Sequence, residues 1–261
     1  MKKIAFLLLL AFLGFSCSKS DDKPGGIDKS ANLLVTGASA HDFLSNEKFS
    51  SLAIEIGYVQ NYQPTQEAVA NLLNFLKART FKQDITVTYK ALPSPMKDSL
   101  SLEEIADLET ENRTAYNQGS TLAVYIYFAD APSKDDDKDS GSVTLGAVYH
   151  NTSMVIHEVT VRKLAAQTSL VSVADAETAT LNHEFGHLFG LVNLGTKETN
   201  PHEDSSSVNH CNRSGCLMRA ELEFGSGLMA TLQSRKMAKL GSTVPSLDSE
   251  CLLDLQANGG R

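Results

Sequence analysis

The pattern that constrains this chain most is a histidine pair in the run His183-Glu184-Phe185-Gly186-His187. The surrounding segment, residues 172–191, is predicted to form a helix. Histidines four residues apart on a helix project from one face, about one turn from each other, and can reach the same zinc ion. In this pattern the glutamate supports a metal-bound water as general base and does not bind the metal. The motif therefore predicts zinc-dependent hydrolysis, with His183 and His187 as metal ligands and Glu184 as the catalytic base.

The residues after the motif bear on the third ligand. Gly190 follows His187 by three residues, and a glycine there permits a sharp turn that brings a later ligand back to the metal. The run from His183 to Gly190 resembles the first part of the metzincin motif of zinc peptidases, in which the third ligand follows the glycine by three residues. That position is Asn193 here, which is a poor zinc ligand.

A second run completes the resemblance. His210-Cys211-Asn212-Arg213-Ser214-Gly215-Cys216-Leu217-Met218 is similar to the archaemetzincin branch, where such a run directly follows the glycine turn. The resemblance implies that residues 192–209 are an insertion and that His210 is the third zinc ligand. It also implies that Met218 is the methionine of the Met-turn, a hydrophobic floor below the metal. His202, within the insertion, is the alternative third ligand.

The cysteines allow a second metal ion. Members of the resembling family often hold a structural zinc with four cysteines, and this chain offers Cys211, Cys216 and Cys251, with Asp248 in place of the fourth. In an exported protein a disulfide among these cysteines is the alternative, and it is the interpretation that the sequence favours.

The N-terminus predicts an exported lipoprotein. Lys2 and Lys3 precede an apolar run, residues 4–15, that is too short to span a bilayer comfortably and is typical of an export signal. Cys17 follows it directly and resembles the lipidated cysteine of a bacterial lipoprotein, so residues 1–17 are predicted to be a signal peptide. Residues 18–29 are polar and contain glycine and proline, as a flexible tether does. An ordinary cleaved signal with a chance cysteine is the alternative.

The remainder, residues 30–261, is predicted to be one domain without internal repeats. Strands are expected at 51–59, 84–92 and 121–128, with one or two more within 145–156. Helices are expected after Pro64, from Ser101 to about Tyr116, and over 172–191, with Ser101 and Glu104 forming a capping box. This order predicts an α/β (α+β) fold with a mixed, mostly parallel, twisted sheet. The resemblance implies a metzincin-like zincin fold, with an upper lobe (30–190) that ends in the active-site helix and a smaller, irregular lower lobe (191–261).

The resemblance also implies a cleft bordered by a strand that binds extended substrate by β-augmentation. Residues 145–150 are predicted to be that strand. Tyr149, His150 and His157 are therefore candidate cleft residues.

Composition narrows the class of partner. The net charge is −8 and no stripe of lysine and arginine is present, which excludes nucleic acid as the main partner. We expect a monomeric zinc metalloendopeptidase, lipid-anchored to the bacterial outer membrane, that hydrolyses extracellular or periplasmic proteins. Two alternatives are a zinc-binding surface adhesion module without turnover, motivated by Asn193 and the insertion, and an amide hydrolase acting on cell-wall peptides.

Overall fold

The structure is a computed structural model that describes residues 27–137 and 142–261. The predicted signal peptide, Cys17 and most of the predicted tether lie outside these residues. No helix in the described part is long and apolar enough to cross a membrane.

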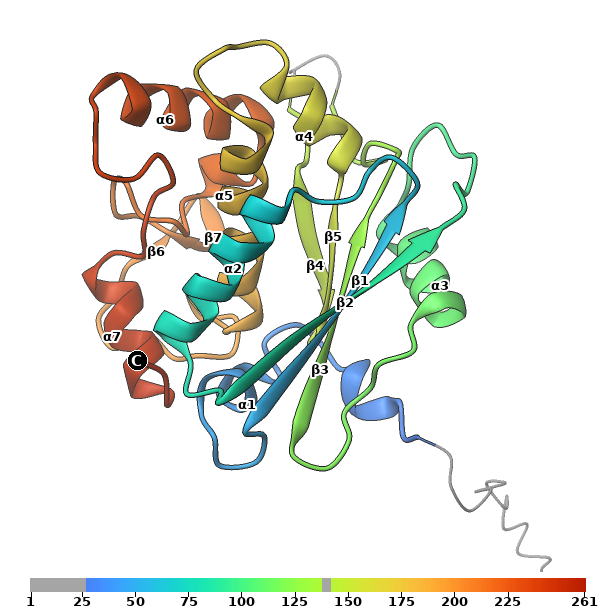
Figure 1. Cartoon of the computed structure of the whole chain (residues 1–261). Coiled ribbons are helices and arrows are strands. Elements are labelled where there is room, and N and C mark those ends of the chain that lie inside the picture. Colours follow the sequence, from blue (N-terminus) through green and yellow to red (C-terminus); the bar gives the residue numbers. More distant parts are fainter. Residues whose placement is uncertain (1–26, 138–141) are drawn as a thin grey trace, which may run out of the picture.

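A five-stranded sheet in the order β2-β1-β3-β5-β4 forms the centre of the molecule (Figure 1). Four of the strands are parallel, and β4 pairs antiparallel with β5 at one edge. This arrangement confirms the predicted mixed, mostly parallel sheet. The strands are β1 (Ser51–Val59), β2 (Asp84–Leu92), β3 (Thr121–Phe128), β4 (Gly146–His150) and β5 (Ser153–Ile156).

The central strand β3 is buried on both faces, which explains its unbroken apolar sequence. Leu122, Val124 and Ile126 join the main hydrophobic cluster, with apolar residues of α2 (Gln66–Arg79) and α5 (Val173–Leu188). Tyr125 and Tyr127 project to the other face, which is covered by α3 (Leu102–Asn112). Figure 1 shows α2 and α5 on one side of the sheet and α3 on the other.

The N-terminus of α3 has the predicted capping box, in which Ser101 and Glu104 each accept the other's backbone N–H. The helix ends at Asn112, however, four residues before the predicted Tyr116. The chain leaves the helix because the buried Arg113 guanidinium binds the Glu109 carboxylate, at 2.6 Å, and the carbonyl of Ala123, at 3.0 Å.

Two short helices and a hairpin complete residues 191–261, and the sequence predicted none of them. The predicted lower lobe therefore has regular structure, and Leu228, Leu232 and Leu255 join it to the main hydrophobic cluster. Its elements are β6 (Glu203–Asp204), β7 (Ser207–Cys211), the 3-10 turn η2 (Ala220–Leu222), α6 (Gly225–Met237) and α7 (Ser249–Ala257). The remaining elements of the described chain are η1 (Ser30–Asn32), α1 (Ala40–Leu44) and α4 (Glu158–Ala165).

The helix that carries the histidine pair, α5, has a capping structure at its N-terminus and a glycine turn after its C-terminus. Ser172 caps its first turn in a capping box with Asp175. Gly190 lies just beyond the last turn with φ +69°, a left-handed conformation that favours glycine. A Cβ there would also lie 2.7 Å from the amide nitrogen of Thr196. The sharp turn predicted at Gly190 is therefore confirmed.

Candidate active site

Three histidines converge at the end of α5. His183 and His187 come from adjacent turns of the helix, and His210 comes from β7. All three are buried, and one ring nitrogen from each lies within 4.8 Å of the others. The Nε2 atoms of His183 and His187 are 3.2 Å apart. Two nitrogens bound to one tetrahedral zinc would be roughly 3.3 Å apart, given Zn–N distances of about 2.0–2.1 Å. The spacing therefore suits a shared metal ion.

Backbone carbonyls orient two of the rings. His183 Nδ1 lies 2.8 Å from the Leu217 carbonyl oxygen, and His210 Nδ1 lies 3.0 Å from that of Val208. Because a carbonyl can only accept, each Nδ1 carries the hydrogen and each Nε2 keeps a free lone pair. A histidine that donates its second N–H in this way is typical of metal sites.

The electrostatics favour neutral rings. Burial, together with a smaller effect of the nearby His210, lowers the pKa of His183 to about 4. Burial also holds the pKa of His187 well below its ordinary value, with His183 and His210 adding to the effect. Neutral imidazoles can bind a cation directly. The buried His210 Nε2 has no hydrogen-bonding partner. A divalent metal ion would satisfy this atom, so the three residues fit such an ion.

Glu184 lies beside the histidines and is almost fully buried. Its carboxylate accepts the backbone N–H of Val148 on β4, while its Oε2 has no partner. Burial, reinforced by the carboxylate of Glu223, raises the pKa of Glu184 well above its ordinary value. Gly146 leaves room for this side chain, because a Cβ there would lie 2.9 Å from the Glu184 Cγ and Oε1 atoms. One oxygen is thus held by β4 and the other is free to take a proton.

Met218 packs directly beneath the histidine pair. A Cβ on Gly186, the glycine of the motif, would lie only 2.1 Å from the Met218 sulfur. Met218 itself is fully buried. The methionine therefore occupies the place under the helix that the family resemblance implied for it.

The two other candidates for the third ligand lie elsewhere. Asn193 has φ +64° in the turn after α5, and its side-chain amide donates to Glu203 of β6. His202 is fully buried, but its Nε2 lies 3.5 Å from the Cys251 sulfur. The structure thus brings His210, and not His202, to His183 and His187.

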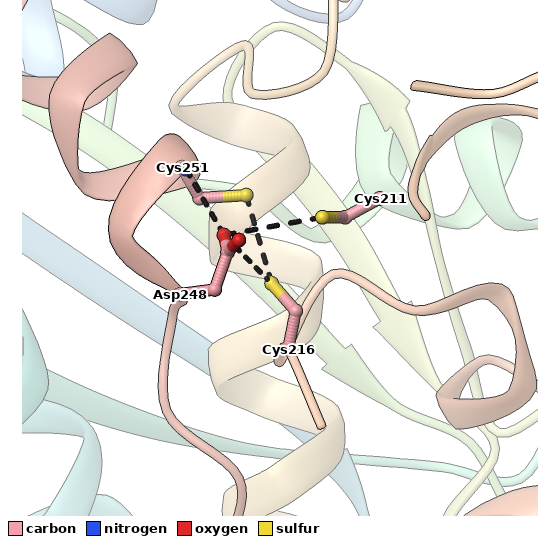
Figure 2. Close-up of side chains that lie close together, drawn as sticks. All are labelled: Cys211, Cys216, Asp248 and Cys251. Carbon is pink, nitrogen blue, oxygen red and sulfur yellow. Dashed lines mark hydrogen bonds between the residues drawn. The ribbon is translucent and has the colours of Figure 1, made fainter. Parts of the chain in front are cut away.

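A second group of metal-binding side chains contains the three cysteines and Asp248 (Figure 2). The sulfur of Cys216 lies 3.6 Å from that of Cys251 and 3.4 Å from the Asp248 carboxylate. All three cysteines are buried, free thiols, contrary to the disulfide that the sequence favoured. Two thiolates on one tetrahedral zinc would be roughly 3.8 Å apart, given Zn–S distances of about 2.3 Å. The thiols of Cys216 and Cys251 also lower the pKa of the Cys211 thiol, which favours a thiolate there.

His202 lies beside this second group. Its Nδ1 lies 2.9 Å from the Asn200 carbonyl, and its Nε2 lies 3.5 Å from both the Cys251 sulfur and the Asp254 carboxylate. Although burial opposes it, the Asn200 carbonyl and the nearby Cys211 and Asp254 raise the pKa of His202. The Asp254 carboxylate is fully buried and has one oxygen without a hydrogen-bonding partner. We call Cys211, Cys216, Cys251, Asp248 and His202 the cysteine cluster, and His183, His187 and His210 the histidine cluster.

The three cleft candidates on and after β4 are corrected. His150 faces α3, with its Nδ1 3.4 Å from the Glu109 carboxylate, and Tyr149 packs in the apolar cluster on the same face of the sheet. His157 is fully buried, and its Nδ1 donates to the carbonyl of Ala131. The register of β4 shifts between Val148 and His150, and of this strand only Ala147 and Val148 line the cleft.

The histidine cluster opens into a cleft of about 290 Å³. Glu223, which the sequence analysis did not single out, lies in its wall with Oε2 3.1 Å from His210 Nε2. Although burial opposes it, the contact with His210 lowers the pKa of Glu223. A lone glutamate five residues after Met218 matches no motif, so only the folded chain reveals its position. The other lining residues are Thr36, Leu102, Ala147, Val148, Glu184, His187, Leu194, Val208, Asn209 and His210.

No family model and no curated protein matches this sequence. Among solved structures, the chain is similar to the crystal structure of archaemetzincin (amzA) from Methanopyrus kandleri. The identity is 15%, the TM-score is 0.50, and the match covers 80% of this chain and 96% of that chain. It also matches metalloproteinase-II from Bacteroides fragilis, with 12% identity, a TM-score of 0.39 and coverage of 90% of this chain and 58% of that chain. The first likeness shows an archaemetzincin-like fold and confirms the predicted fold class.

Proposed function

We propose that this chain is a zinc-dependent peptidase whose catalytic metal is held by His183, His187 and His210. The observation that carries the proposal is the convergence of three buried imidazoles with one carboxylate, Glu184, at an open cleft. A site with three protein ligands and one open side is typical of catalytic zinc, because water or substrate takes the remaining position. The archaemetzincin-like fold supports the same conclusion.

The residues around the metal have distinct roles in this mechanism. Zinc, when bound, supplies a Lewis acid that polarises the scissile carbonyl and acidifies water. Glu184 takes the proton of the attacking water on Oε2 and passes it to the leaving nitrogen. The N–H of Val148 holds the other oxygen of Glu184, so the carboxylate keeps its direction during both transfers. The carbonyls of Leu217 and Val208 fix the rings of His183 and His210.

The free edge of β4 is suited to bind the substrate. β4 is the last strand of the sheet, and its residues Ala147 and Val148 line the cleft above the histidine cluster. An extended peptide can pair with such an edge through main-chain hydrogen bonds. This mode of binding needs no particular side chain, which suits hydrolysis of unfolded or exposed segments of proteins.

We further propose that the cysteine cluster holds a second, structural zinc. Its thiols are buried, and buried tetrahedral sites rich in cysteine are the usual structural zinc sites. Two residues are available for the fourth position, His202 and Asp248. The Asp248 carboxylate already accepts the backbone N–H of Cys251 at the start of α7, whereas His202 Nε2 lies 3.5 Å from the Cys251 sulfur. We therefore propose that His202, in its neutral form, takes the fourth position, which predicts that His202→Ala weakens zinc binding in this cluster more than Asp248→Asn.

Glu184→Gln tests the peptidase function. The variant keeps the shape of the side chain but cannot act as a base, so we expect it to bind zinc like the wild type and to lose at least a hundredfold in cleavage rate. Wild type and variant are incubated with casein and with a peptide library, and the products are identified by mass spectrometry. Glu67→Gln, on the first turn of α2, is the matched control. Zinc bound by both proteins with no cleavage by either would contradict the proposal and favour a binding module.

The place of action follows from the N-terminus. The basic start, the apolar run and Cys17 support export and lipid anchoring, so we propose that the substrates are proteins outside the cytoplasm. Metabolic labelling with a fatty-acid analogue tests this, since the label is expected on the wild type and absent from Cys17→Ser. Equal labelling of both proteins would contradict it.

A further inference from the structure

Glu223 is a carboxylate beside the histidine cluster for which the proposed mechanism has no role. We propose that Glu223 makes the enzyme selective for substrates with a lysine or arginine on the C-terminal side of the scissile bond. This inference rests on the proposed peptidase function and adds a substrate class to it.

The one ion-pair contact of Glu223 is with a proposed metal ligand. Its Oε2 lies 3.1 Å from His210 Nε2, the nitrogen that His210 directs at the other two histidines. A metal ion bound by His210 would occupy that nitrogen. Among the described residues, Glu223 has no ion pair with lysine or arginine, and no lysine or arginine lines the cleft.

Glu223 lies beside the histidine cluster but is not one of its members. Of the three histidines, only His210 lies within ion-pair distance of the carboxylate. The three histidine nitrogens form the compact group without it. The side chain is 29% exposed, so a group that enters the cleft can reach it. A partly exposed carboxylate without a lysine or arginine partner can bind a cationic side chain.

The backbone around Glu223 closes one end of the cleft. The carbonyl of Glu223 accepts the N–H of Leu145 at 3.3 Å, and the N–H of Gly225 donates to the carbonyl of Val143 at 2.9 Å. Thr144 and Phe224 form an isolated antiparallel bridge between the same two segments. These contacts join the Glu223 segment to the chain just before β4, so the carboxylate stands at the end of the cleft where β4 begins.

The direction of β4 decides which substrate residue meets this wall. A peptide that pairs antiparallel with β4 runs toward the first residue of the strand, Gly146, as its own chain proceeds from N to C. The part of the substrate that reaches this end therefore lies on the C-terminal side of the scissile bond. A cationic side chain there pairs with Glu223, and an acidic one is repelled by it.

Cleavage-site profiling of the zinc-loaded wild type and Glu223→Gln tests the selectivity. We expect lysine and arginine to be favoured after the cleaved bond by about ten- to a hundredfold over leucine in the wild type, and the preference to disappear in the variant. Glu223→Arg is expected to favour aspartate and glutamate instead. Glu221→Gln is the matched control, because Glu221 lies two residues away and pairs with Arg219 at 2.9 Å.

Binding is measured separately, so that failure of the inference can be told from failure of the peptidase function. Fluorescent peptides that differ only in one residue (arginine, leucine or glutamate) are titrated into Glu184→Gln and into Glu184→Gln with Glu223→Arg. Tighter binding of the arginine peptide, reversed by Glu223→Arg, supports the inference even if no peptide is cleaved. Two results would overturn the inference directly: equal cleavage-site profiles for wild type and Glu223→Gln, or equal binding of the three peptides. It would also be overturned if Glu223→Gln bound zinc more weakly but kept the preference for lysine and arginine. A preference that is lost when the amino terminus of the peptide is acetylated would overturn it as well, because Glu223 would then bind that terminus and not a side chain.

Discussion

The histidine cluster and the cysteine cluster both gather metal-binding side chains, but they differ in their access to solvent. The histidine cluster borders a cleft of about 290 Å³, and Glu184 beside it has an oxygen without a partner. The cysteine cluster is enclosed, with Cys211, Cys216, Cys251 and His202 all buried. Catalytic zinc needs an open position and structural zinc does not. The difference therefore supports the proposal of a catalytic role for the first cluster and a structural role for the second.

The two clusters also share backbone, so they are not independent. His210 and Cys211 are consecutive, and the N–H of Cys211 donates to the carbonyl of Met218 at 2.7 Å. Cys216 is followed by Leu217, whose carbonyl orients His183. A metal ion in the cysteine cluster would thus hold both the strand that carries His210 and the turn that supports His183. We expect loss of the cysteine-cluster metal to weaken the histidine cluster more than the reverse.

The largest effect is expected from Cys216→Ser. Losing one thiolate of a buried site leaves the remaining donors unpaired, and we expect the free energy of unfolding to fall by about 3–5 kcal/mol. His210→Gln removes a ligand at the open cluster and is expected to cost about 1 kcal/mol or less. Urea denaturation of both variants and the wild type, in the presence of zinc, measures the difference. Equal losses in the free energy of unfolding in the two variants would contradict the distinction between a structural and a catalytic cluster.

A smaller effect is expected where Met218 supports the helix. In Gly186→Ala the new methyl group would overlap the Met218 sulfur, so one of them must move. We expect a loss of about 1–3 kcal/mol in the free energy of unfolding, as for other overpacked cores, together with weaker zinc binding at the histidine cluster. Gly241→Ala is the control, because a Cβ there meets no atom within 4 Å. If both variants behave like the wild type, Met218 is not a support for the site.

The smallest effect concerns a buried carboxyl pair on α4 and α5, away from both clusters. Burial and then the charge of Glu177 raise the pKa of Glu158 to about 9, although Arg162 opposes this. The folded state therefore binds the proton of Glu158 more tightly than the unfolded state. Its contribution to stability is complete below the unfolded pKa of about 4.5 and is lost as the pH rises through about 9.

Glu158→Gln removes this titration while it keeps the neutral shape of the side chain. We expect the variant and the wild type to have equal stability near pH 4.5, and the variant to be the more stable of the two at pH 8, where the unfolded wild type has released the Glu158 proton. Urea denaturation across this pH range gives both values. Parallel pH profiles for the two proteins would contradict this prediction, because they would show that Glu158 is ionised in the folded protein over this pH range.

Much of the fold could be predicted because the signals were local. The alternation in β1 and β2 and the apolar run of β3 gave the correct bounds of all three strands. The helices that escaped prediction lack such signals. α4 has only eight residues and begins with a buried glutamate, and α6 begins Gly-Ser-Gly. Their burial depends on partners far away in the sequence, so tertiary packing decides them.

The candidate site also has a part that the sequence predicted and a part that only the folded chain reveals. The spacing of His183 and His187 is a property of one helix, so the sequence alone placed both on one face. His202 and His210 both follow the turn at Gly190, and only the folding of the inserted hairpin separates them into two clusters. Glu223 reaches the cleft through backbone pairing with residues 143–145, which no short-range pattern encodes.

The assignment of the two clusters is tested most directly by the metal content of His210→Ala beside His202→Ala. Native mass spectrometry gives the zinc stoichiometry, and cobalt substitution distinguishes the sites, because only cobalt bound to cysteine shows a thiolate charge-transfer band. We predict two zinc ions in the wild type. His210→Ala is expected to retain one, with the thiolate band intact and peptide cleavage abolished. In His202→Ala the thiolate band is expected to weaken, while the histidine cluster keeps its zinc. Loss of the histidine-cluster metal in His202→Ala alone, with an unchanged thiolate band, would contradict the assignment.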